Sequence, residues 1–375
     1  MKRILFITGT RADYGKIKSL IRIVDNDQSY KTFVFVSGMH LLEQLGSTYM
    51  EVLKDNYKNV YVDFSQTNSG VMSYDLGNVI CNLTNYVRQI KPDLIVVHGD
   101  RIDTMAGAIV GALNNILVAH IEGGELSGTI DESIRHSITK LAHIHLVCNR
   151  EAKNRLIQLG EEEKRIYIMG SPDIDIMLSN NLPSISETKE RYEIPYDKYG
   201  ILMYHPVTTE IDKLEKNIEN VIKAVELSKK NMVVIYPNND LGAEIIISRL
   251  RKLKGNSKFR VFPSIRFEYF LALLKNADFM IGNSSAGVRE TGVYGVPGID
   301  IGTRQFGRYS MNNTNIQHVY ENVSDIITAI NKIDNYRKKC YQFGAGNSTD
   351  KFYTLLKNNC FWNIPIQKRF IDLKK

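Results

Sequence analysis

Short runs of isoleucine, valine and phenylalanine alternate along the whole chain with stretches whose apolar residues recur at helical spacing. This alternation is typical of parallel sheets that helices cover on both faces. In the first half, strands are predicted over residues 3–8, 32–37, 59–64, 93–98, 116–121, 143–148 and 165–169. In the second half, they are predicted over 201–204, 232–236, 259–262, 279–281 and 298–301. The sequence therefore predicts an α/β protein with two Rossmann-like, doubly wound sheets.

The length of the chain and one break in the alternation predict two domains. Domains commonly hold roughly 100–200 residues, so 375 residues fit two of them. Residues 172–195 are less regular and contain prolines, as a crossing segment between domains does. We expect an N-terminal Rossmann-like domain over 1–171, a C-terminal one over 172–355, and a separate C-terminal segment over 356–375.

Composition and charge exclude several classes of protein. With 43% hydrophobic and 24% charged residues, the chain is an ordinary folded one and not a disordered one. The net charge of +7 comes from basic residues spread along the chain, which argues against a nucleic-acid surface. The longest uncharged stretch, 104–121, is predicted to be a helix followed by a strand, so we expect no membrane span.

The N-terminus and the cysteines predict a cytoplasmic protein. The first apolar run covers only residues 4–7, which is too short for a secretion signal. The four cysteines lie far apart, without a CxxC pair, as expected in a reducing compartment. His143 and His145 share one face of a predicted strand, but no thiol or acid accompanies them, so packing is favoured over metal binding.

In doubly wound sheets, ligands bind outside the carboxyl ends of the strands, so the residues after each strand are the first candidates for a site. The segment after the first strand, 9–16, has the wrong spacing for a nucleotide triphosphate loop. No GxGxxG follows any strand, which disfavours nicotinamide chemistry. Two interpretations stay open for this segment: a turn with a helix cap, or anion binding by Arg11.

Acidic residues follow two neighbouring strands of the first half. Asp100 comes after 93–98, where Asp103 is an alternative helix cap, and Glu122 comes after 116–121. Asp131 lies in the first turn of a helix whose start is marked by a capping box, and the helix dipole favours its ionised form. A surface pair between Asp131 and Arg135, four residues later, is the alternative role.

Polar donors follow the strands of the second half. His205 comes after 201–204, and Asn238 lies just after 232–236. The segment 282–287, Gly-Asn-Ser-Ser-Ala-Gly, opens a predicted helix with two serines, an arrangement that binds a diphosphate without metal or lysine. Glu290 follows about one and a half helical turns later, where it could accept hydrogen bonds from both hydroxyls of a ribose. The alternative is that Glu290 is an acid on the helix surface without such a role.

Seven segments of the chain together resemble one family. They are ITGTRADYGK, VVHGDR, AHIEGGELSGTIDESIRHSITKLAHIHLV, YHPVTTE, YPNND, GNSSAGVRE and GTRQFGR. They resemble the hydrolysing UDP-N-acetylglucosamine 2-epimerases, and more narrowly those of the bacterial sialic acid pathway. The resemblance implies the GT-B architecture, in which two Rossmann-like domains face each other across a crevice, and a C-terminal segment that packs back on the N-terminal domain.

The resemblance also implies a reaction. UDP leaves C1 while the C2 proton is removed, and the resulting 2-acetamidoglucal adds water to give N-acetylmannosamine, a precursor for sialic acid in capsules or surface glycans. Asp100, Glu122 and Asp131 match the catalytic acids of the family, and His205, Arg11 and Arg101 match residues near the diphosphate. The other matching positions are Ser284 and Ser285 for the phosphates, Glu290 for the ribose, Arg304 nearby, and Asn238 and Ile265 for the uracil side.

By this resemblance the partners are UDP-N-acetylglucosamine, UDP and further copies of the chain in a homodimer or homotetramer, and neither a metal nor an organic cofactor is required. One alternative is a hydrolysing epimerase for a related sugar, such as the UDP-diacetamidobacillosamine of the legionaminic acid pathway. A non-hydrolysing epimerase is disfavoured, because the Glu-Gly-Gly-Glu-Leu-Ser-Gly segment resembles the hydrolysing branch. A GT-B glycosyltransferase would use one base rather than three acids, and a non-catalytic sensor of nucleotide sugars would need none of them.

Overall fold

The computed structural model describes residues 1–65, 69–312 and 314–372 and contains two compact units. Unit 1 comprises Met1–Glu125, Asp131–Leu178 and Phe343–Lys375, and unit 2 comprises Leu126–Ile130 and Ser179–Gln342. The sequence had suggested changes of domain after 171 and after 355. Each unit is described by itself below.

Unit 1 is built on a seven-stranded parallel sheet in the order β3-β2-β1-β4-β5-β6-β7. Its strands are apolar and almost fully buried at the centre, because helices cover both faces. The order reverses direction between β1 and β4, which is the switch point where ligands bind in such sheets. The strands are β1 (Lys2–Thr8), β2 (Tyr30–Val36), β3 (Val60–Val62), β4 (Leu94–His98), β5 (Leu117–Ile121), β6 (Ile144–Val147) and β7 (Ile166–Ile168).

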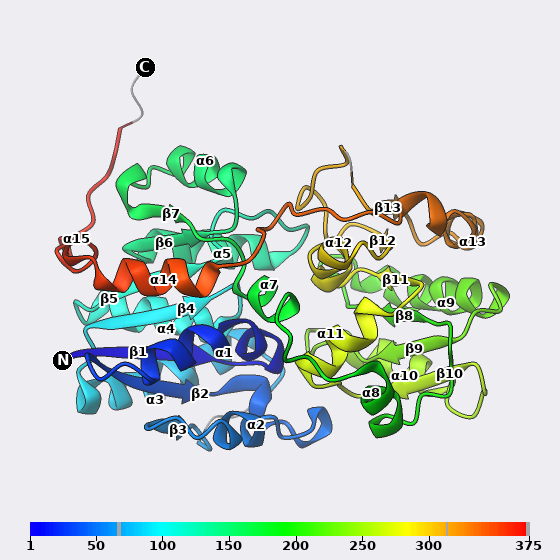
Figure 1. Cartoon of the computed structure of the whole chain (residues 1–375), viewed down its shortest axis with the longest axis horizontal. Helices are drawn as coiled ribbons and strands as arrows, with labels where there is room; N and C mark the ends of the chain where they lie inside the picture. Colours follow the sequence, from blue (N-terminus) through cyan, green and yellow to red (C-terminus); the bar gives the residue numbers. More distant parts are fainter. Residues whose placement is uncertain (66–68, 313, 373–375) are drawn as a thin grey trace. The chain divides into compact units, whose positions relative to one another are not determined.

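Helices of unit 1 form a layer on each side of this sheet (Figure 1). One layer includes α1 and α14, which contact each other, and another includes α3 and α4, which also pack together. The helices are α1 (Arg11–Asp25), α2 (Tyr49–Lys54), α3 (Met72–Ile90), α4 (Ile102–Leu113), α5 (Ile130–Leu141), α6 (Arg150–Gln158), α7 (Pro172–Met177), α14 (Ser348–Lys357) and α15 (Asn359–Trp362).

Unit 2 repeats the design with a six-stranded parallel sheet in the order β10-β9-β8-β11-β12-β13. Its strands are β8 (Gly200–Met203), β9 (Met232–Ile235), β10 (Phe259–Phe262), β11 (Phe279–Gly282), β12 (Gly298–Ile301) and β13 (Ile316–Val319). Its helices are α8 (Ile185–Arg191), α9 (Ile211–Leu227), α10 (Ala243–Arg251), α11 (Phe267–Lys275), α12 (Glu290–Tyr294) and α13 (Val323–Asn331). Here the direction reverses between β8 and β11, so the tips of these two strands flank the expected ligand position.

The last helices belong to the core of unit 1. Phe352 and Phe361 are buried there, and the Phe352 ring lies edge-on to that of Phe6 in β1. Trp362 stacks on Tyr30, with ring centroids 6.5 Å apart. Unit 1 is therefore completed by a segment that is remote in sequence from its first strand.

A set of charged and polar side chains around the buried Glu161 attaches the last residues of unit 1 to α5 and β6, and we call it the Glu161 network: Glu161, Lys140, His145 and Lys368. The Glu161 carboxylate lies 2.8 Å from Lys140 Nζ, 2.9 Å from His145 Nε2 and 2.6 Å from Lys368 Nζ. Burial alone would raise the pKa of Glu161, but the hydrogen bond from His145 and the charge of Lys368 lower it to about 2. His143 contacts main-chain atoms through both ring nitrogens, whereas His145 pairs with Glu161, so the expectation that no acid accompanies these histidines is wrong for His145.

The predicted fold class is confirmed, since both sheets are parallel and covered by helices. Every predicted strand is present, with its ends shifted by at most two residues. β13 was not predicted, because its four residues Ile-Gln-His-Val offer neither a continuous apolar run nor a clear alternation.

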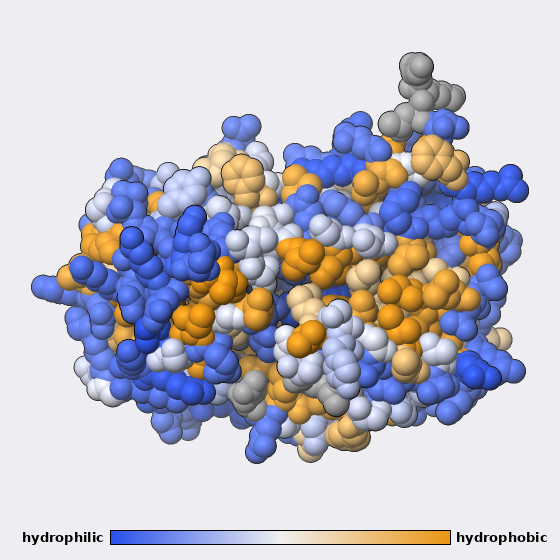
Figure 2. Space-filling view, turned by 180° about the vertical axis from the view of Figure 1, so that it is seen from behind, coloured by the Kyte–Doolittle hydropathy of each residue, from blue (hydrophilic) through white to orange (hydrophobic). Residues whose placement is uncertain are grey.

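Apolar side chains also reach the surface of unit 1. Figure 2 shows such side chains gathered on the face of unit 1 that carries α3 and α4. Exposed apolar residues of these helices include Tyr74 and Leu113, which are 57% and 77% exposed. Within the described part of the chain, no helix combines the length and apolar character that crossing a membrane requires.

Candidate active site

Asp100 lies just beyond the buried end of β4, where the chain turns sharply. Gly99 makes the turn with a φ of +79°, a conformation that favours glycine. The Gly99 carbonyl lies 2.8 Å from Nε2 of His120, whose pKa burial lowers to about 3, so the ring is neutral and donates this hydrogen bond. The turn that carries Asp100 is therefore held in place by a neutral imidazole from β5.

The Asp100 carboxylate pairs with Arg135 of α5. The Arg135 side chain is fully buried, whereas that of Asp100 is 18% exposed, and Arg135 Nη1 also donates to the Glu125 carbonyl at 2.9 Å. The sequence-based alternative, which made Arg135 a surface residue, is therefore wrong: its guanidinium joins the tip of β4 to the loop after β5. The pairing of Asp100 with Arg135 depends on the order of the strands in the sheet, and the spacing of neighbouring residues in the sequence does not indicate that order.

Asp131 lies in the first turn of α5, as predicted, and is partly exposed. It precedes Arg135 by four residues, so the two side chains start from the same face of the helix, with Cβ atoms about 5–6 Å apart. Because Arg135 reaches Asp100, the first turn of α5 lies close to the tip of β4. The structure thus brings the beginning of α5 and Asp100 together within unit 1.

Glu122 follows β5 directly and has a left-handed backbone, with a φ of +67°. Such a conformation is uncommon for a residue with a side chain and costs on the order of 1 kcal/mol or more. The carboxylate is buried, and its Oε1 lies 3.4 Å from Lys16 Nζ, 3.2 Å from His98 Nε2 and 3.1 Å from Ser171 Oγ. A strained residue whose carboxylate meets several donors is typical of a functional position.

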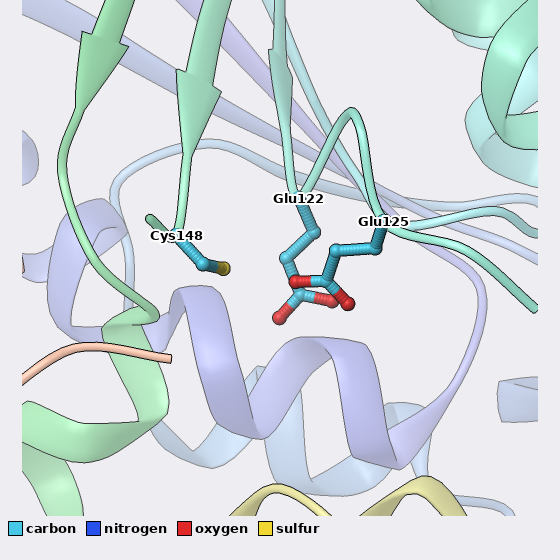
Figure 3. Close-up of side chains that lie close together, drawn as sticks. All are labelled: Glu122, Glu125 and Cys148. Atoms are coloured by element: carbon cyan, nitrogen blue, oxygen red, sulfur yellow. The ribbon is translucent and has the colours of Figure 1, made fainter. Parts of the chain in front are cut away.

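Two further potential ligands surround Glu122. Donor atoms of Glu122, Glu125 and Cys148 all lie within 4.8 Å of one another, and Figure 3 shows the two carboxylates directed to the same place. Such a donor set could hold a cation, and the Lys16 ammonium already supplies a positive charge at Glu122. The expectation that no metal is required remains a prediction.

The segment 9–16 contains the N-cap and the first residues of α1. Thr10 caps α1 in a capping box with Asp13, which confirms this interpretation of the turn. Arg11 donates from Nη2 to Glu51 Oε1 at 2.6 Å, and Arg101 is the N-cap residue of α4, with Nη2 3.7 Å from Met39 Sδ. Anion binding by Arg11 and Arg101 stays a prediction.

Asp103 is not the cap of α4 that its position suggested. It lies inside the first turn, is buried, and accepts a hydrogen bond of 2.5 Å from Ser37 Oγ. Burial raises the pKa of Asp103 to about 6, only partly offset by the hydrogen bond from Ser37. Asp103 therefore supports the turn after β2 rather than capping the start of α4.

In unit 2, His205 lies two residues beyond β8, and its ring orientation is fixed by main chain. The Asn238 backbone N–H donates to His205 Nδ1 at 3.2 Å. A donor at Nδ1 requires this nitrogen to be the acceptor, so the neutral ring carries its hydrogen on Nε2. His205 can therefore offer an N–H group from Nε2, while Asn238 acts here through its backbone.

The serine segment differs from the predicted helix start. Ser284 caps a short 3-10 turn, Ser285–Gly287, with its hydroxyl 3.4 Å from the Ala286 backbone N, and α12 begins only at Glu290. The prediction that 282–287 opens an α-helix directly is therefore wrong, because the chain makes a separate turn first. Glu290 is buried in the first turn of α12 and is not the surface acid of the alternative interpretation.

The remaining predicted positions also belong to unit 2. Ile265 is buried just before α11, and Arg304 is buried in the loop after β12, with Nη1 3.2 Å from the Asn283 carbonyl. The Arg304 carbonyl accepts from the Gly128 N–H at 3.0 Å, and a Cβ on Gly128 would lie 1.9 Å from the Thr303 carbonyl. A glycine is therefore required where the segment 126–130 passes this loop.

Sequence reasoning missed five residues around Glu122: Lys16, His98, Glu125, Cys148 and Ser171. Lys16 ends the segment 9–16, whose spacing does not fit a triphosphate loop, yet it points from α1 to Glu122 and also lies 3.7 Å from Asp173. The Glu-Gly-Gly-Glu spacing could have indicated Glu125. Nothing local in the sequence connects Ser171 to Glu122, since 49 positions separate them.

Known proteins resemble this chain along its full length. The sequence profile of the family described as UDP-N-acetylglucosamine 2-epimerase matches residues 22–357. The chain is 50% identical to a UDP-N-acetylglucosamine 2-epimerase of Neisseria meningitidis serogroup B, with all of both chains covered. It is 30% identical to the hydrolysing UDP-N,N'-diacetylbacillosamine 2-epimerase of Legionella pneumophila, covering 99% of this chain and 98% of the relative.

A solved structure resembles the fold. The crystal structure of UDP-GlcNAc 2-epimerase from Neisseria meningitidis bound to UDP-GlcNAc superposes with a TM-score of 0.80 at 19% identity, covering 95% of this chain and 100% of the other. At this identity the likeness concerns the fold alone. It confirms the GT-B type expected from the sequence.

Proposed function

Because the chain belongs to the UDP-N-acetylglucosamine 2-epimerase family, we propose that it is a hydrolysing member, converting UDP-N-acetylglucosamine and water to N-acetylmannosamine and UDP. One observation carries the proposal: the strand tips of unit 1 gather Asp100, Glu122 and the first turn of α5 with Asp131. The Legionella relative, whose name includes hydrolysis, supports the same reaction type.

In the proposed reaction, residues of unit 2 hold UDP. The Nε2–H group of His205 and the hydroxyls of Ser284 and Ser285 are uncharged donors suited to phosphate oxygens. Glu290 would accept the ribose hydroxyls, and Arg304 would supply positive charge. Such donors stabilise the negative charge that develops on the diphosphate as it departs.

The first step is an elimination. A carboxylate removes the C2 proton, the electron pair of the C2–H bond forms the C1–C2 double bond, and the C1–O bond breaks to release UDP as the anion. Positive charge that develops at C1 is stabilised by a nearby carboxylate, as in glycoside cleavage. Asp131, at the positive end of α5, fits the role of base or electrostatic stabiliser, and Asp100 and Glu122 are assigned to proton transfer.

The second step is a hydration. A carboxyl group gives a proton to C2 on the face opposite to the first removal, and a carboxylate takes a proton from the water that attacks C1. The product is N-acetylmannosamine. The carboxyl groups take one proton from C2 and one from water and return one to C2, and the remaining proton is released to solvent. Lys16 and Ser171 both lie at Oε1 of Glu122. They would help to position the Glu122 carboxyl group and to stabilise its ionised form.

Products of a single incubation test the proposal. Purified protein with UDP-N-acetylglucosamine should release UDP and free N-acetylmannosamine in equal amounts, measured by phosphorus and proton NMR. Asp100→Asn and Glu122→Gln should lower this rate by a factor of about 100 or more, since general acid–base groups commonly contribute that much. Formation of UDP-N-acetylmannosamine without free UDP would show a non-hydrolysing enzyme instead.

A second candidate is hydrolysis of a related sugar nucleotide. The 30% identity to the Legionella enzyme favours UDP-N,N'-diacetylbacillosamine as the alternative substrate. Comparison of kcat/KM for the two substrates decides between them, and we expect the acetylglucosamine nucleotide to be preferred because the Neisseria relative is the more similar one. The role in sialic acid synthesis, the cytoplasmic location and the homodimer or homotetramer remain parts of the proposal, the last testable by light scattering.

A further inference from the structure

Asn283 lies between β11 and the serine turn, and its side chain is completely buried. The chain reaches it through Gly282, which has a φ of +132° and passes so close to β8 that a Cβ there would lie 2.0 Å from the Met203 carbonyl. This close approach places the Asn283 side chain beside the end of β8. The proposed function assigns this residue no role.

The side-chain amide of Asn283 binds both main-chain groups of one residue, His205. The His205 N–H donates to Asn283 Oδ1 at 2.6 Å, and Asn283 Nδ2 donates to the His205 carbonyl at 2.8 Å. The backbone N–H of Asn283 donates to the Met203 carbonyl at 3.2 Å. The amide thus continues the pairing of β8 and β11 beyond the point where the strands end.

The backbone carbonyl of Asn283 binds the loop after β12. It accepts from Gln305 Nε2 at 2.9 Å and from Arg304 Nη1 at 3.2 Å. Gln305 is itself completely buried. One residue therefore connects three strand tips of unit 2, and each tip carries a side chain assigned above to UDP: His205, Ser284 and Arg304.

We propose that Asn283 is a positioning residue of the UDP site: without touching the nucleotide, it sets His205, the serine turn and Arg304 in one arrangement. This inference rests on the proposed function for the identity of the ligand. Asparagine suits the position because one amide supplies an acceptor and a donor in opposite directions. An aspartate would instead direct a second acceptor oxygen at the His205 carbonyl and push it away.

Calorimetric titration with UDP separates positioning from a general contribution to stability. Asn283→Asp and Asn283→Ala should raise the Kd for UDP by about tenfold, because a buried hydrogen-bonding group is left without its partner and the donors shift. The fitted stoichiometry counts folded sites, so a variant that is only unstable loses stoichiometry and keeps its affinity. The matched control is Gln317→Ala, which removes a buried amide of β13 that binds the Ala329 carbonyl at 3.0 Å.

The inference holds if the Asn283 variants lose affinity for UDP while Gln317→Ala stays within twofold of wild type. It is overturned if folded Asn283 variants bind UDP like wild type, or if the control loses affinity equally. Should neither Asn283 variant fold, Gln305→Met decides: a Kd raised about threefold supports the inference, and an unchanged Kd overturns it. A wild-type protein that binds UDP but releases no N-acetylmannosamine contradicts the proposed function alone.

Discussion

Replacing Arg135 by methionine tests how firmly the acids of unit 1 are built into the fold. Arg135 is fully buried and serves both the Asp100 carboxylate and the Glu125 carbonyl, so the variant leaves both acceptors without this donor. Breaking a buried ion pair from one side costs about 3–5 kcal/mol. Because Asp100 keeps 18% exposure, water replaces part of the lost interaction, and we expect the lower end, about 3 kcal/mol.

Urea unfolding followed by tryptophan fluorescence measures the expected loss of stability in unit 1. The sequence has one tryptophan, Trp362, and it packs within unit 1. Arg22→Met is the matched control, because Arg22 pairs with Asp55 at 3.0 Å but is 54% exposed, and such pairs contribute at most about 1 kcal/mol. If Arg135→Met and Arg22→Met destabilised unit 1 equally, the buried role of Arg135 would be refuted.

Three further predictions concern the nucleotide site and the pH dependence of stability. Ser285→Ala should weaken UDP binding about fivefold in calorimetry through loss of one hydrogen bond, and unchanged affinity would count against a diphosphate at the serine turn. A hydrogen bond to Asp300 raises the pKa of His318 above its usual 6.5, so its stabilisation is present below pH 6.5 and lost as the pH rises through the higher value. A His318→Gln variant should therefore melt below wild type at pH 6 and approach it at pH 9. The pKa of Glu161, lowered to about 2 from 4.5, gives the opposite dependence: its stabilisation exists above pH 4.5 and fades as the pH falls toward 2. Glu161→Gln should thus cost about 3 kcal/mol at pH 7 and little near pH 2, and a constant loss across this range would refute the assignment.

Much of the fold was predictable because each strand carries its own signal. Parallel strands covered on both faces are almost wholly apolar, so runs such as that of β4 are visible without any tertiary information. β13 lacks this signal, since polar residues occupy half of its four positions. The resemblance implied a return to the N-terminal domain only for residues 356–375, whereas unit 1 already includes α14, because no local pattern says which core a terminal helix joins.

The sequence predicted those site residues that directly follow a strand. It did not predict contacts between side chains that are distant in the sequence. Asp100 and Glu122 were found because both follow β-strands. The partnership of Asp100 with Arg135 spans 35 positions and requires the docking of α5, so local spacing suggested the nearer Asp131 instead. The role of Asn283 also depends on how closely β11 approaches β8, and no local sequence pattern indicates that distance.

The central claim is that carboxyl groups of unit 1 remove and return a proton at C2 of the sugar. The most direct measurement is proton NMR of the N-acetylmannosamine formed from UDP-N-acetylglucosamine in deuterated water. The account predicts one deuterium at C2 of every product molecule, and product formation slowed by a factor of about 100 or more with Glu122→Gln. A product that keeps its original C2 hydrogen would contradict elimination and hydration.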